Sequence, residues 1–337
     1  MFIPVVSKKG KPLMPTTPYR ARKLIKAGKA IKKFKKGLFY ILLTERMIGK
    51  TQDIAVGIDP GIKKEAFTIK SNSHTYLNIQ IDAINWVKDN VKTRSLLRRS
   101  RRQRKTPYRK CRLNRKKSKN LQPSIKARWQ WKLRIINFLV SIFPITYFIV
   151  EDIKAKSKKN CKKWNMSFSP LEDGKNYFYT ELRKQGNVEL KMGYDTAELR
   201  NNLKLEKSYN KNSNKFEAHC IDSFVLANWF VGGHLTPDNK NILLIKPIEL
   251  HRRQLHRLQP SKKGIRRRYG STNSLGFKRG SLVKHVKYGL CYVGGYLKNN
   301  ISLHNIENGK RITQKAELKD CICLNFNAWK ISYLFNK

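Results

Sequence analysis

Three acidic side chains stand at positions where carboxylates can do chemistry. Asp59 closes the short strand predicted from residue 53 onward, and Glu151 directly follows the apolar run 145–150. Asp222 lies three residues after His219, in a segment whose apolar residues recur at helical spacing. A carboxylate at the end of a buried strand can hold a metal ion, although Asp59 before a proline is by itself more often a turn cap. The three positions together favour a metal site.

The elements around these carboxylates predict that they meet. A helical pattern separates the two predicted strands, and a strand–helix–strand order favours parallel pairing. Parallel neighbours place Glu151 beside Asp59, at the strand ends where open α/β sheets bind ligands. Asp222 and His219 share one face of a helix predicted over about 217–230, because residues three apart on a helix face the same way.

Such a cluster is expected to hold metal ions that also bind phosphate. Asp59, Glu151 and Asp222 suit two Mg²⁺ ions, for which Mn²⁺ is able to substitute, since hard cations prefer oxygen ligands and phosphate supplies the rest. We expect Glu151 to bridge the two ions. His219 is the candidate to orient or deprotonate the attacking water. A lone histidine on a helix is more often a surface or core residue, and the acid three residues later is what favours a site.

The charge of the chain indicates a polyanionic partner. Its 337 residues include 73 Lys and Arg against 22 Asp and Glu, a formal net charge of +51. Nucleic acid is the expected partner, and an anionic membrane surface is the weaker alternative. We find neither an apolar run of transmembrane length nor a signal-peptide pattern after Met1. The six scattered cysteines fit reduced thiols, so a cytoplasmic location without membrane contact is expected.

A run of basic residues without any acid covers 94–115. Several of its members recur at the three-to-four spacing of one helical face, and Pro107 is expected to end or kink this helix. A charge run is usually a solvated face or a disordered tail, but this one is internal and of one sign, which favours a phosphate-lined groove. The residues predicted to contact these phosphates are Arg94, Arg98, Arg99, Arg101, Arg102, Arg104, Lys105, Arg109 and Arg112.

The amino-terminal residues 1–45 predict a small separate unit. It contains a strand at 2–6, a helix that Thr17 caps and Gly28 terminates, and a strand at 38–43. Its helix is strongly basic, which fits a surface facing phosphates or a merely solvated surface about equally.

Further local patterns complete the central region. Two strands, at 66–69 and 75–79, extend the strand that ends at Asp59 into a meander. Ser124 is expected to cap the helix before Glu151, and Trp229 is expected to be buried on the later helix.

The chain becomes β-rich after about residue 258. Short apolar runs alternate with turn residues, and Asn308-Gly309 is a good hairpin signal. We predict a small twisted sheet or barrel that docks on duplex nucleic acid. The residues predicted to bind DNA are Arg266, Arg267, Arg268, Lys278 and Arg279.

Taken together, these segments resemble a RuvC nuclease of the RNase H fold, divided into three pieces. Residues 56–61 (Val-Gly-Ile-Asp-Pro-Gly) resemble its first motif, 148–153 (Phe-Ile-Val-Glu-Asp-Ile) its second and 218–223 (Ala-His-Cys-Ile-Asp-Ser) its third. The arginine run resembles the bridge helix of Cas9 and its transposon-encoded relatives, which implies that its basic residues bind RNA. The Lys-Pro-Leu-Met-Pro of 11–15 resembles the PLMP module of the IscB and IsrB proteins of insertion sequences.

Other segments are similar to IsrB proteins in particular, namely Trp-Asn-Met-Ser-Phe-Ser-Pro at 164–170 and Leu199-Arg200. The resemblance implies an α/β fold with a split RuvC, RNase H-like core. It divides the chain into a PLMP module at 1–50, RuvC piece I at 51–93, an arginine-rich bridge helix at 94–119, RuvC pieces II and III at 120–260, and a β-rich module at 261–337 that interacts with a target-adjacent motif.

The resemblance also implies a function. Such a protein binds a long non-coding guide RNA (omega RNA) and opens double-stranded target DNA next to a short target-adjacent motif. Larger relatives carry an HNH nuclease between the second and third RuvC pieces, but no histidine lies between Glu151 and His219. We therefore expect a Mg²⁺-dependent nickase of the non-target strand, acting as a monomeric protein in a ribonucleoprotein.

Two alternatives remain open from the sequence. One alternative is a catalytically silent RNA-guided DNA-binding protein, and the other is a guide-free junction resolvase of the RNase H fold. The three clustered carboxylates argue against a pure binding protein, and the charge of +51 with an internal arginine helix favours a large RNA partner over a guide-free resolvase.

Overall fold

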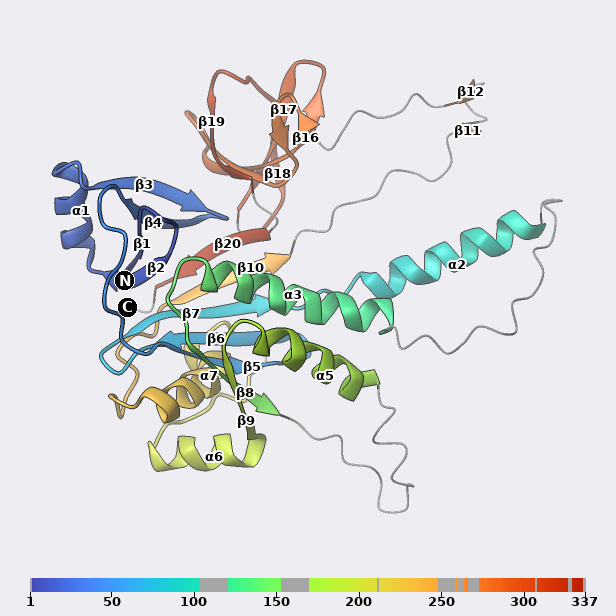
Figure 1. The fold of residues 1–337 in the computed structure, drawn as a ribbon. Helices are drawn as coiled ribbons and strands as arrows, with labels where there is room; N and C mark the ends of the chain where they lie inside the picture. Colours follow the sequence, from blue (N-terminus) through green and yellow to red (C-terminus); the bar gives the residue numbers. More distant parts are fainter. Residues whose placement is uncertain are drawn as a thin grey trace, which may run out of the picture.

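A seven-stranded mixed sheet lies at the centre of the computed structural model of this chain (Figure 1). The structure describes residues 2–103, 121–152, 170–210, 212–247, 258–259, 264–265, 273–306, 308–326 and 329–335. In spatial order the strands of the central sheet are β20 (Trp329–Leu334), β10 (Ile242–Pro247), β7 (Thr75–Asp82), β6 (Lys64–Lys70), β5 (Ala55–Asp59), β8 (Tyr147–Asp152) and β9 (Asn187–Met192). The mixed α/β class predicted from the sequence is confirmed.

The pairing of the central strands follows the sequence prediction. Strands β5, β6 and β7 form the predicted antiparallel meander. Strand β8 pairs with β5 in parallel, with Ile58 opposite Val150. Strands β9 and β10 were not predicted; they pair in parallel with β8 and β7, respectively.

Helices cover both faces of this sheet. On one face α3 (Pro123–Val140) and α5 (Pro170–Arg183) pack over Val56 and Ile58. On the other face α7 (Phe216–Val231) packs against β5 and β6, with α6 (Gly193–Asn202) beside it (Figure 1). The long helix α2 (Val87–Gln103) extends away from the sheet.

Two local expectations were wrong. Gln122, rather than Ser124, is the N-cap of α3, because Pro123 takes the first helical position with its preset backbone angle. Trp229 is 38 % exposed instead of buried, and the ammonium of Lys191 lies 3.6 Å from its ring centroid. A cation over an indole face stabilises such a half-exposed ring.

The amino-terminal unit forms its own four-stranded sheet in the order β2-β1-β4-β3. Thr17 caps its helix as predicted, since the Thr17 hydroxyl accepts from the Arg20 N–H at 3.4 Å, and Gly28 follows with φ +69°. The unit packs on the central domain through Lys36, whose ammonium lies 4.6 Å from the ring centroid of Trp329. Its elements are β1 (Ile3–Val6), β2 (Pro12–Thr16), α1 (Pro18–Lys26), β3 (Ala30–Lys35) and β4 (Leu38–Leu43).

A five-stranded antiparallel sheet follows near the end of the chain, in the order β18-β17-β16-β15-β19. Its strands are β15 (Ser281–His285), β16 (Gly289–Leu297), β17 (Asn300–Asn305), β18 (Arg311–Ala316) and β19 (Cys321–Phe326). Two short hairpins precede it, formed by β11 (Leu258–Gln259) with β12 (Gly264–Ile265) and by β13 (Asn273–Ser274) with β14 (Phe277–Lys278). This β-rich region agrees with the sequence prediction.

The last strand returns to the central sheet. β20 pairs antiparallel with β10, so that the five-stranded sheet is an insertion between two neighbouring central strands. Trp329 at the start of β20 is fully buried and makes edge-on contacts with Trp131 and Phe138 of α3. The N–H of Ile331 donates to the Tyr292 hydroxyl at 2.9 Å, which ties the inserted sheet to β20.

Within the described ranges, no helix combines the length and the apolar character that a membrane crossing requires.

Glycine at position 57 allows α7 to approach the central sheet closely. A Cβ atom on Gly57 would lie 1.8 Å from the carbonyl oxygen of Ser223, which real structures do not tolerate. The Ser223 hydroxyl lies 2.8 Å from that of Thr68 on β6, so a polar contact accompanies the close approach. Asp222 precedes Ser223, and its position therefore depends on this contact.

Replacing Gly57 by alanine is expected to destabilise the protein by about 1–3 kcal/mol or more, because the helix backbone must move to admit the methyl group. Thermal unfolding followed by circular dichroism measures the effect. Gly295→Ala is the matched control, since a Cβ atom there would meet no atom within 4 Å. Equal melting temperatures for the two variants would contradict the close contact.

Candidate metal centre and nucleic-acid interface

Asp59, Glu151 and Asp222 come together at the carboxyl ends of β5 and β8, beside α7. Each offers one carboxylate oxygen, and these three atoms all lie within 4.8 Å of one another. Ile58 and Val150 are partners in parallel strands, so the acid that follows each of them lies side by side with the other. Asp222 is buried and the other two are half-buried. The structure thus groups the three carboxylates at one site, as their positions in the sequence suggest.

Local sequence explains why each acid points to this edge. Pro60 cannot donate to a sheet ladder, and β5 ends at Asp59. Along β5, Val56 and Ile58 pack toward α3, so Gly57 and Asp59 face α7. The approach of α7 at Gly57 then brings Asp222 to the same face.

The site is electrostatically costly without a cation. Burial, followed by the charges of Glu151 and Asp222, raises the pKa of Asp59 well above its usual value. Burial is also the largest cause of the raised pKa of Glu151, and the charge of Asp222 adds to it. The Asp59 and Glu151 side chains are hydrogen-bonded to each other. A bound cation would favour the ionised forms, so its binding should release protons.

This donor set fits a hard divalent cation such as Mg²⁺ or Mn²⁺. All three potential ligands are carboxylates, and the cluster contains neither cysteine nor histidine. Carboxylate oxygens suit magnesium, calcium and manganese better than softer metals. Burial, with a smaller contribution from neighbouring carboxylates, raises the pKa values of Asp59 and Glu151, and a bound cation would favour their ionised forms.

Asp222 already carries two cationic partners from the protein. The guanidinium of Arg200, in α6, donates to its Oδ1 at 2.6 Å, and the ammonium of Lys207 donates to its Oδ2. Lys207 lies on the connection between α6 and α7. Sequence reasoning singled out neither residue for the site, because nothing in their spacing separates them from the other basic residues of the chain.

Gly193 is a further neighbour of the cluster that the sequence did not reveal. A Cβ atom on this first residue of α6 would lie 3.1 Å from Oε1 of Glu151. The amino-terminal end of α6 therefore borders the carboxylates, and its carboxyl-terminal turn supplies Arg200.

His219 lies in the first turn of α7, half-buried and three residues before Asp222. It is not one of the residues whose ligand atoms form the 4.8 Å cluster. Its part in the chemistry is taken up below as a proposal.

The predicted RNA-binding residues lie only partly within the described structure. Arg94, Arg98 and Arg99 are exposed on α2. Arg101 and Arg102 belong to the same helix, whose described part ends at Gln103. Arg104, Lys105, Arg109 and Arg112, with the expected kink at Pro107, lie outside the described residues.

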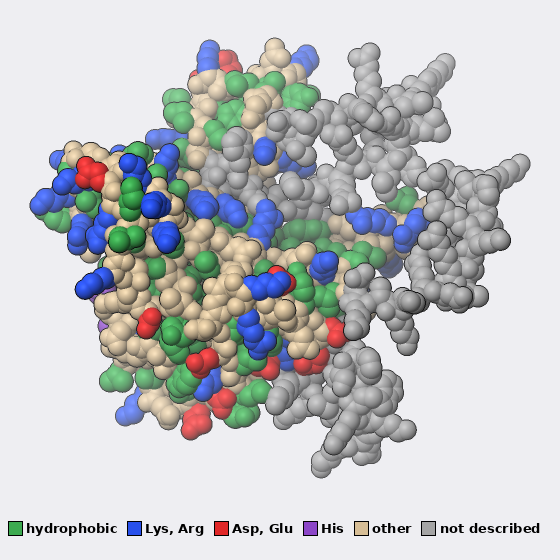
Figure 2. All heavy atoms as spheres, viewed as in Figure 1, with side chains coloured by type: hydrophobic (Ala, Val, Ile, Leu, Met, Phe, Trp, Pro, Cys, Tyr) green, Lys and Arg blue, Asp and Glu red, His purple; other side chains and the backbone are tan. Residues whose placement is uncertain are grey.

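The predicted DNA-binding residues are divided in the same way. Lys278 and Arg279 are exposed at the turn after β14. Arg266, Arg267 and Arg268 lie outside the described residues. Lys and Arg side chains are spread widely over the face shown in Figure 2, most densely on the amino-terminal unit.

The arginines of α2 are expected to contact nucleic-acid phosphates. Changing Arg98, Arg101 and Arg102 together to alanine should lower the slope of log Kd against log salt by roughly 0.7 to 0.9 for each phosphate that the variant no longer neutralises. Binding of a fluorescently labelled single-stranded RNA probe, measured at several salt concentrations, tests this.

The matched control is a triple alanine variant of lysines that already have acidic partners. Lys184, Lys240 and Lys319 pair with Glu181, Glu217 and Glu317. Their removal should change the slope less than the removal of the α2 arginines. Equal slopes for the wild type and the α2 variant would show that the arginine run is only a solvated face.

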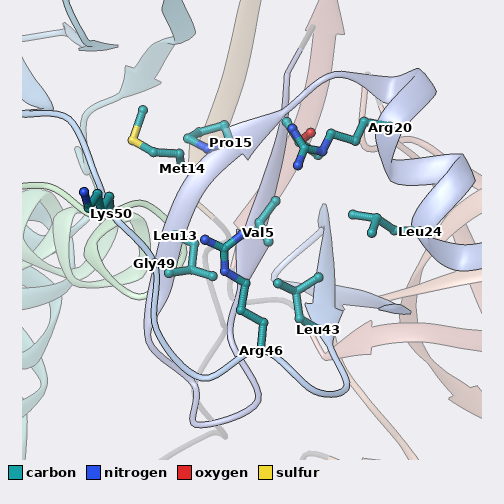
Figure 3. A pocket seen from close by; sticks show the side chains of 11 residues that line it. Val5, Leu13, Met14, Pro15, Arg20, Leu24, Leu43, Arg46, Gly49 and Lys50 are labelled. Carbon is teal, nitrogen blue, oxygen red and sulfur yellow. The ribbon is translucent and has the colours of Figure 1, made fainter. Parts of the chain in front are cut away.

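A cavity of about 160 Å³ lies in the amino-terminal unit, away from the carboxylates (Figure 3). Its floor is apolar and includes Val5, Leu13 and Leu43. Arg20 and Arg46 extend their guanidinium groups over it. This cavity contains no acid among its lining residues and does not belong to the candidate metal centre.

The fold and the site define a mixed α/β protein with a carboxylate cluster at the edge of its sheet. Residues 3–164 match the sequence model of the RRXRR protein family. Residues 98–102 read Arg-Arg-Ser-Arg-Arg, the pattern that this family name describes.

Two solved structures are similar to parts of the chain. The first is RuvC of T. thermophilus in complex with a Holliday junction substrate, with 11 % sequence identity and a TM-score of 0.30 over 54 % of this chain and 98 % of that chain. The second is the yeast mitochondrial Holliday junction resolvase Ydc2, with 14 % identity and a TM-score of 0.28 over 53 % of this chain and 78 % of that chain. No curated protein matches the sequence.

Proposed function

We propose that this chain is a metal-dependent, RNA-guided DNA endonuclease that nicks the non-target strand. The observation that carries the proposal is the convergence of Asp59, Glu151 and Asp222 within 4.8 Å in a protein of formal net charge +51. A protein that only binds a polyanion gains nothing from clustered carboxylates, since they repel phosphate and are costly to bury. With divalent cations bound, the same cluster attracts phosphate.

The proposed roles follow from the positions of the residues. Asp59, Glu151 and Asp222 hold the metal, and His219 orients or deprotonates the attacking water from one turn before Asp222. A bound Mg²⁺ or Mn²⁺ supplies charge neutralisation at the phosphate under attack and makes water more acidic. The arginines of α2 bind the RNA backbone, and the basic turn at Lys278 and Arg279 contacts duplex DNA near the target-adjacent motif.

The proposal includes a bound guide RNA that selects the target. It is supported by the internal arginine run and by the resemblance of the three carboxylate segments and of residues 11–15 to RNA-guided nucleases. Base pairing would then read the target sequence while the protein contacts the backbone. We place this ribonucleoprotein, with a single copy of the chain, in the cytoplasm. A guide-free resolvase would instead be purified without a discrete, tightly bound RNA.

Removing a metal ligand should abolish cutting without unfolding the protein. Asp59→Ala and Glu151→Ala are expected to leave no detectable nicking in Mg²⁺, while RNA and target binding stay nearly unchanged. Without metal, both variants should melt no lower than the wild type, because each removes one of the mutually repelling carboxylates. His219→Ala should slow nicking by about 10²- to 10⁴-fold.

Glu181→Ala is the control for these variants, since Glu181 lies on α5 and pairs with Lys184 at the surface. It should nick at the wild-type rate. Cutting by either Asp59→Ala or Glu151→Ala would refute the assignment of the site.

One nuclease site should cut one strand. No histidine lies between Glu151 and His219, so this segment cannot supply the water-activating histidine of an HNH site. A target duplex labelled on both strands and incubated with the ribonucleoprotein and Mg²⁺ should show a nick only in the strand not paired with RNA. Cutting of the guide-paired strand, or clean double-strand breaks at low enzyme excess, would overturn this part of the proposal.

A further inference from the structure

Two cationic side chains reach from the surface onto the buried carboxylate of Asp222. Arg200 and Lys207 occupy its two oxygens, one each. Their side chains are 17 % and 36 % exposed, against 2 % for Asp222. Both cations are therefore partly accessible to solvent while they contact the buried carboxylate.

This arrangement exceeds what a structural carboxylate needs. One cation would neutralise Asp222, yet two contact it. Although burial alone would lower the pKa of the Lys207 ammonium, its hydrogen bond to Asp222 and the charges of all three carboxylates raise it. Lys207 thus interacts with the whole cluster and not with a single partner.

Metal and side-chain cations compete for the same oxygens. A divalent ion held by Asp222 would coordinate the oxygens to which Arg200 and Lys207 donate, and would place a like charge beside both side chains. Two divalent ions also outweigh the charge of three carboxylates. In a loaded site the two side chains lose most of their attraction to the cluster, and the closest new anion is the phosphate of a bound nucleic acid.

We propose that Arg200 and Lys207 are phosphate-binding residues of the nuclease site. Held on Asp222 in the metal-free chain, their cationic groups contact the phosphate under attack, or its neighbour, when metal and DNA are bound. Arginine suits this task because its planar fork pairs phosphate oxygens bidentately, and lysine provides a compact charge. Both stabilise the negative charge that grows on the phosphoryl oxygens. This inference rests on the proposed function and deepens it.

The backbone around both residues is anchored, so that only the side chains need to move. The Leu205 N–H donates to the Arg200 carbonyl at 3.1 Å, and Leu205 packs against the cluster around Phe216. The Ser208 N–H donates to the Glu217 carbonyl at 2.9 Å. Lys207 lies between these two anchored residues, and a change of rotamer is sufficient to turn its ammonium toward a ligand.

A binding measurement that needs no cleavage provides the first test. The probe is a short fluorescein-labelled oligothymidylate, bound to the full-length protein with and without Ca²⁺, which occupies carboxylate sites. Basic surfaces away from the metal site contribute equally to the Kd with and without Ca²⁺, so the ratio of the two Kd values reports only the binding that depends on the site. Wild-type protein should bind several-fold more tightly with Ca²⁺, and Arg200→Ala and Lys207→Ala should lose most of this gain.

The controls separate this inference from the proposed function. Lys215→Ala removes an exposed charge from the same connection and should keep the full gain. Lys207→Arg, which retains the charge, should restore most of it. If Ca²⁺ still tightens oligonucleotide binding fully in both alanine variants, the role of Arg200 and Lys207 is refuted and the metal centre is not. If Ca²⁺ does not tighten binding in the wild type, both the role of these residues and the metal centre are refuted.

Nicking and metal affinity give a second test with effects of opposite sign. Without nucleic acid, Arg200→Ala and Lys207→Ala should bind Mn²⁺ more tightly than the wild type, because a competing cation is gone. At saturating Mn²⁺, each should nick about 10²-fold more slowly, as expected when a group that stabilises the reacting phosphate is removed. Tighter metal binding with an unchanged nicking rate would show that the two cations only neutralise Asp222.

Discussion

The close contact between β5 and α7 at Gly57 is the constraint on which the rest of the site depends. With no Cβ atom in the way, the helix backbone lies directly on the strand, and the buried Asp222 is delivered to the edge where Asp59 and Glu151 end their strands. The strands supply two acids through their parallel register, but only this approach supplies the third. The apolar residues of α7, such as Ile221 and Val225, then bury the helix against the sheet and hold it there.

Placing like charges together in a very basic protein creates a second requirement. The three carboxylates repel one another, and burial makes Asp59 and Glu151 harder to ionise. Two cationic side chains, Arg200 of α6 and Lys207 of the connection after it, partly offset this negative charge by pairing with Asp222. These cations offset the charge of the cluster, and under our proposal the binding of a metal ion would release them from it.

The sequence predicted the parts of this site that are encoded locally. Apolar runs ending in an acid or in Pro60 identified β5 and β8, and helical spacing identified α7. Strands β9, β10 and β20 were not predicted from the sequence. Lys207 could not be singled out among 73 basic residues, since only the folded chain shows which of them faces an acid. Trp229 was misplaced because helical spacing does not reveal where a helix leaves its sheet.

Because β20 returns to the central sheet, the β-rich module between β10 and β20 is joined to that sheet at both of its ends. Its two attachment points, Pro247 and Trp329, are register partners on neighbouring antiparallel strands. A β-rich module of different size can therefore take its place while Pro247 and Trp329 remain paired in the central sheet. Truncating the chain before β20 has a different result, since it removes an outer strand from the central sheet and leaves β10 as an open edge that can aggregate.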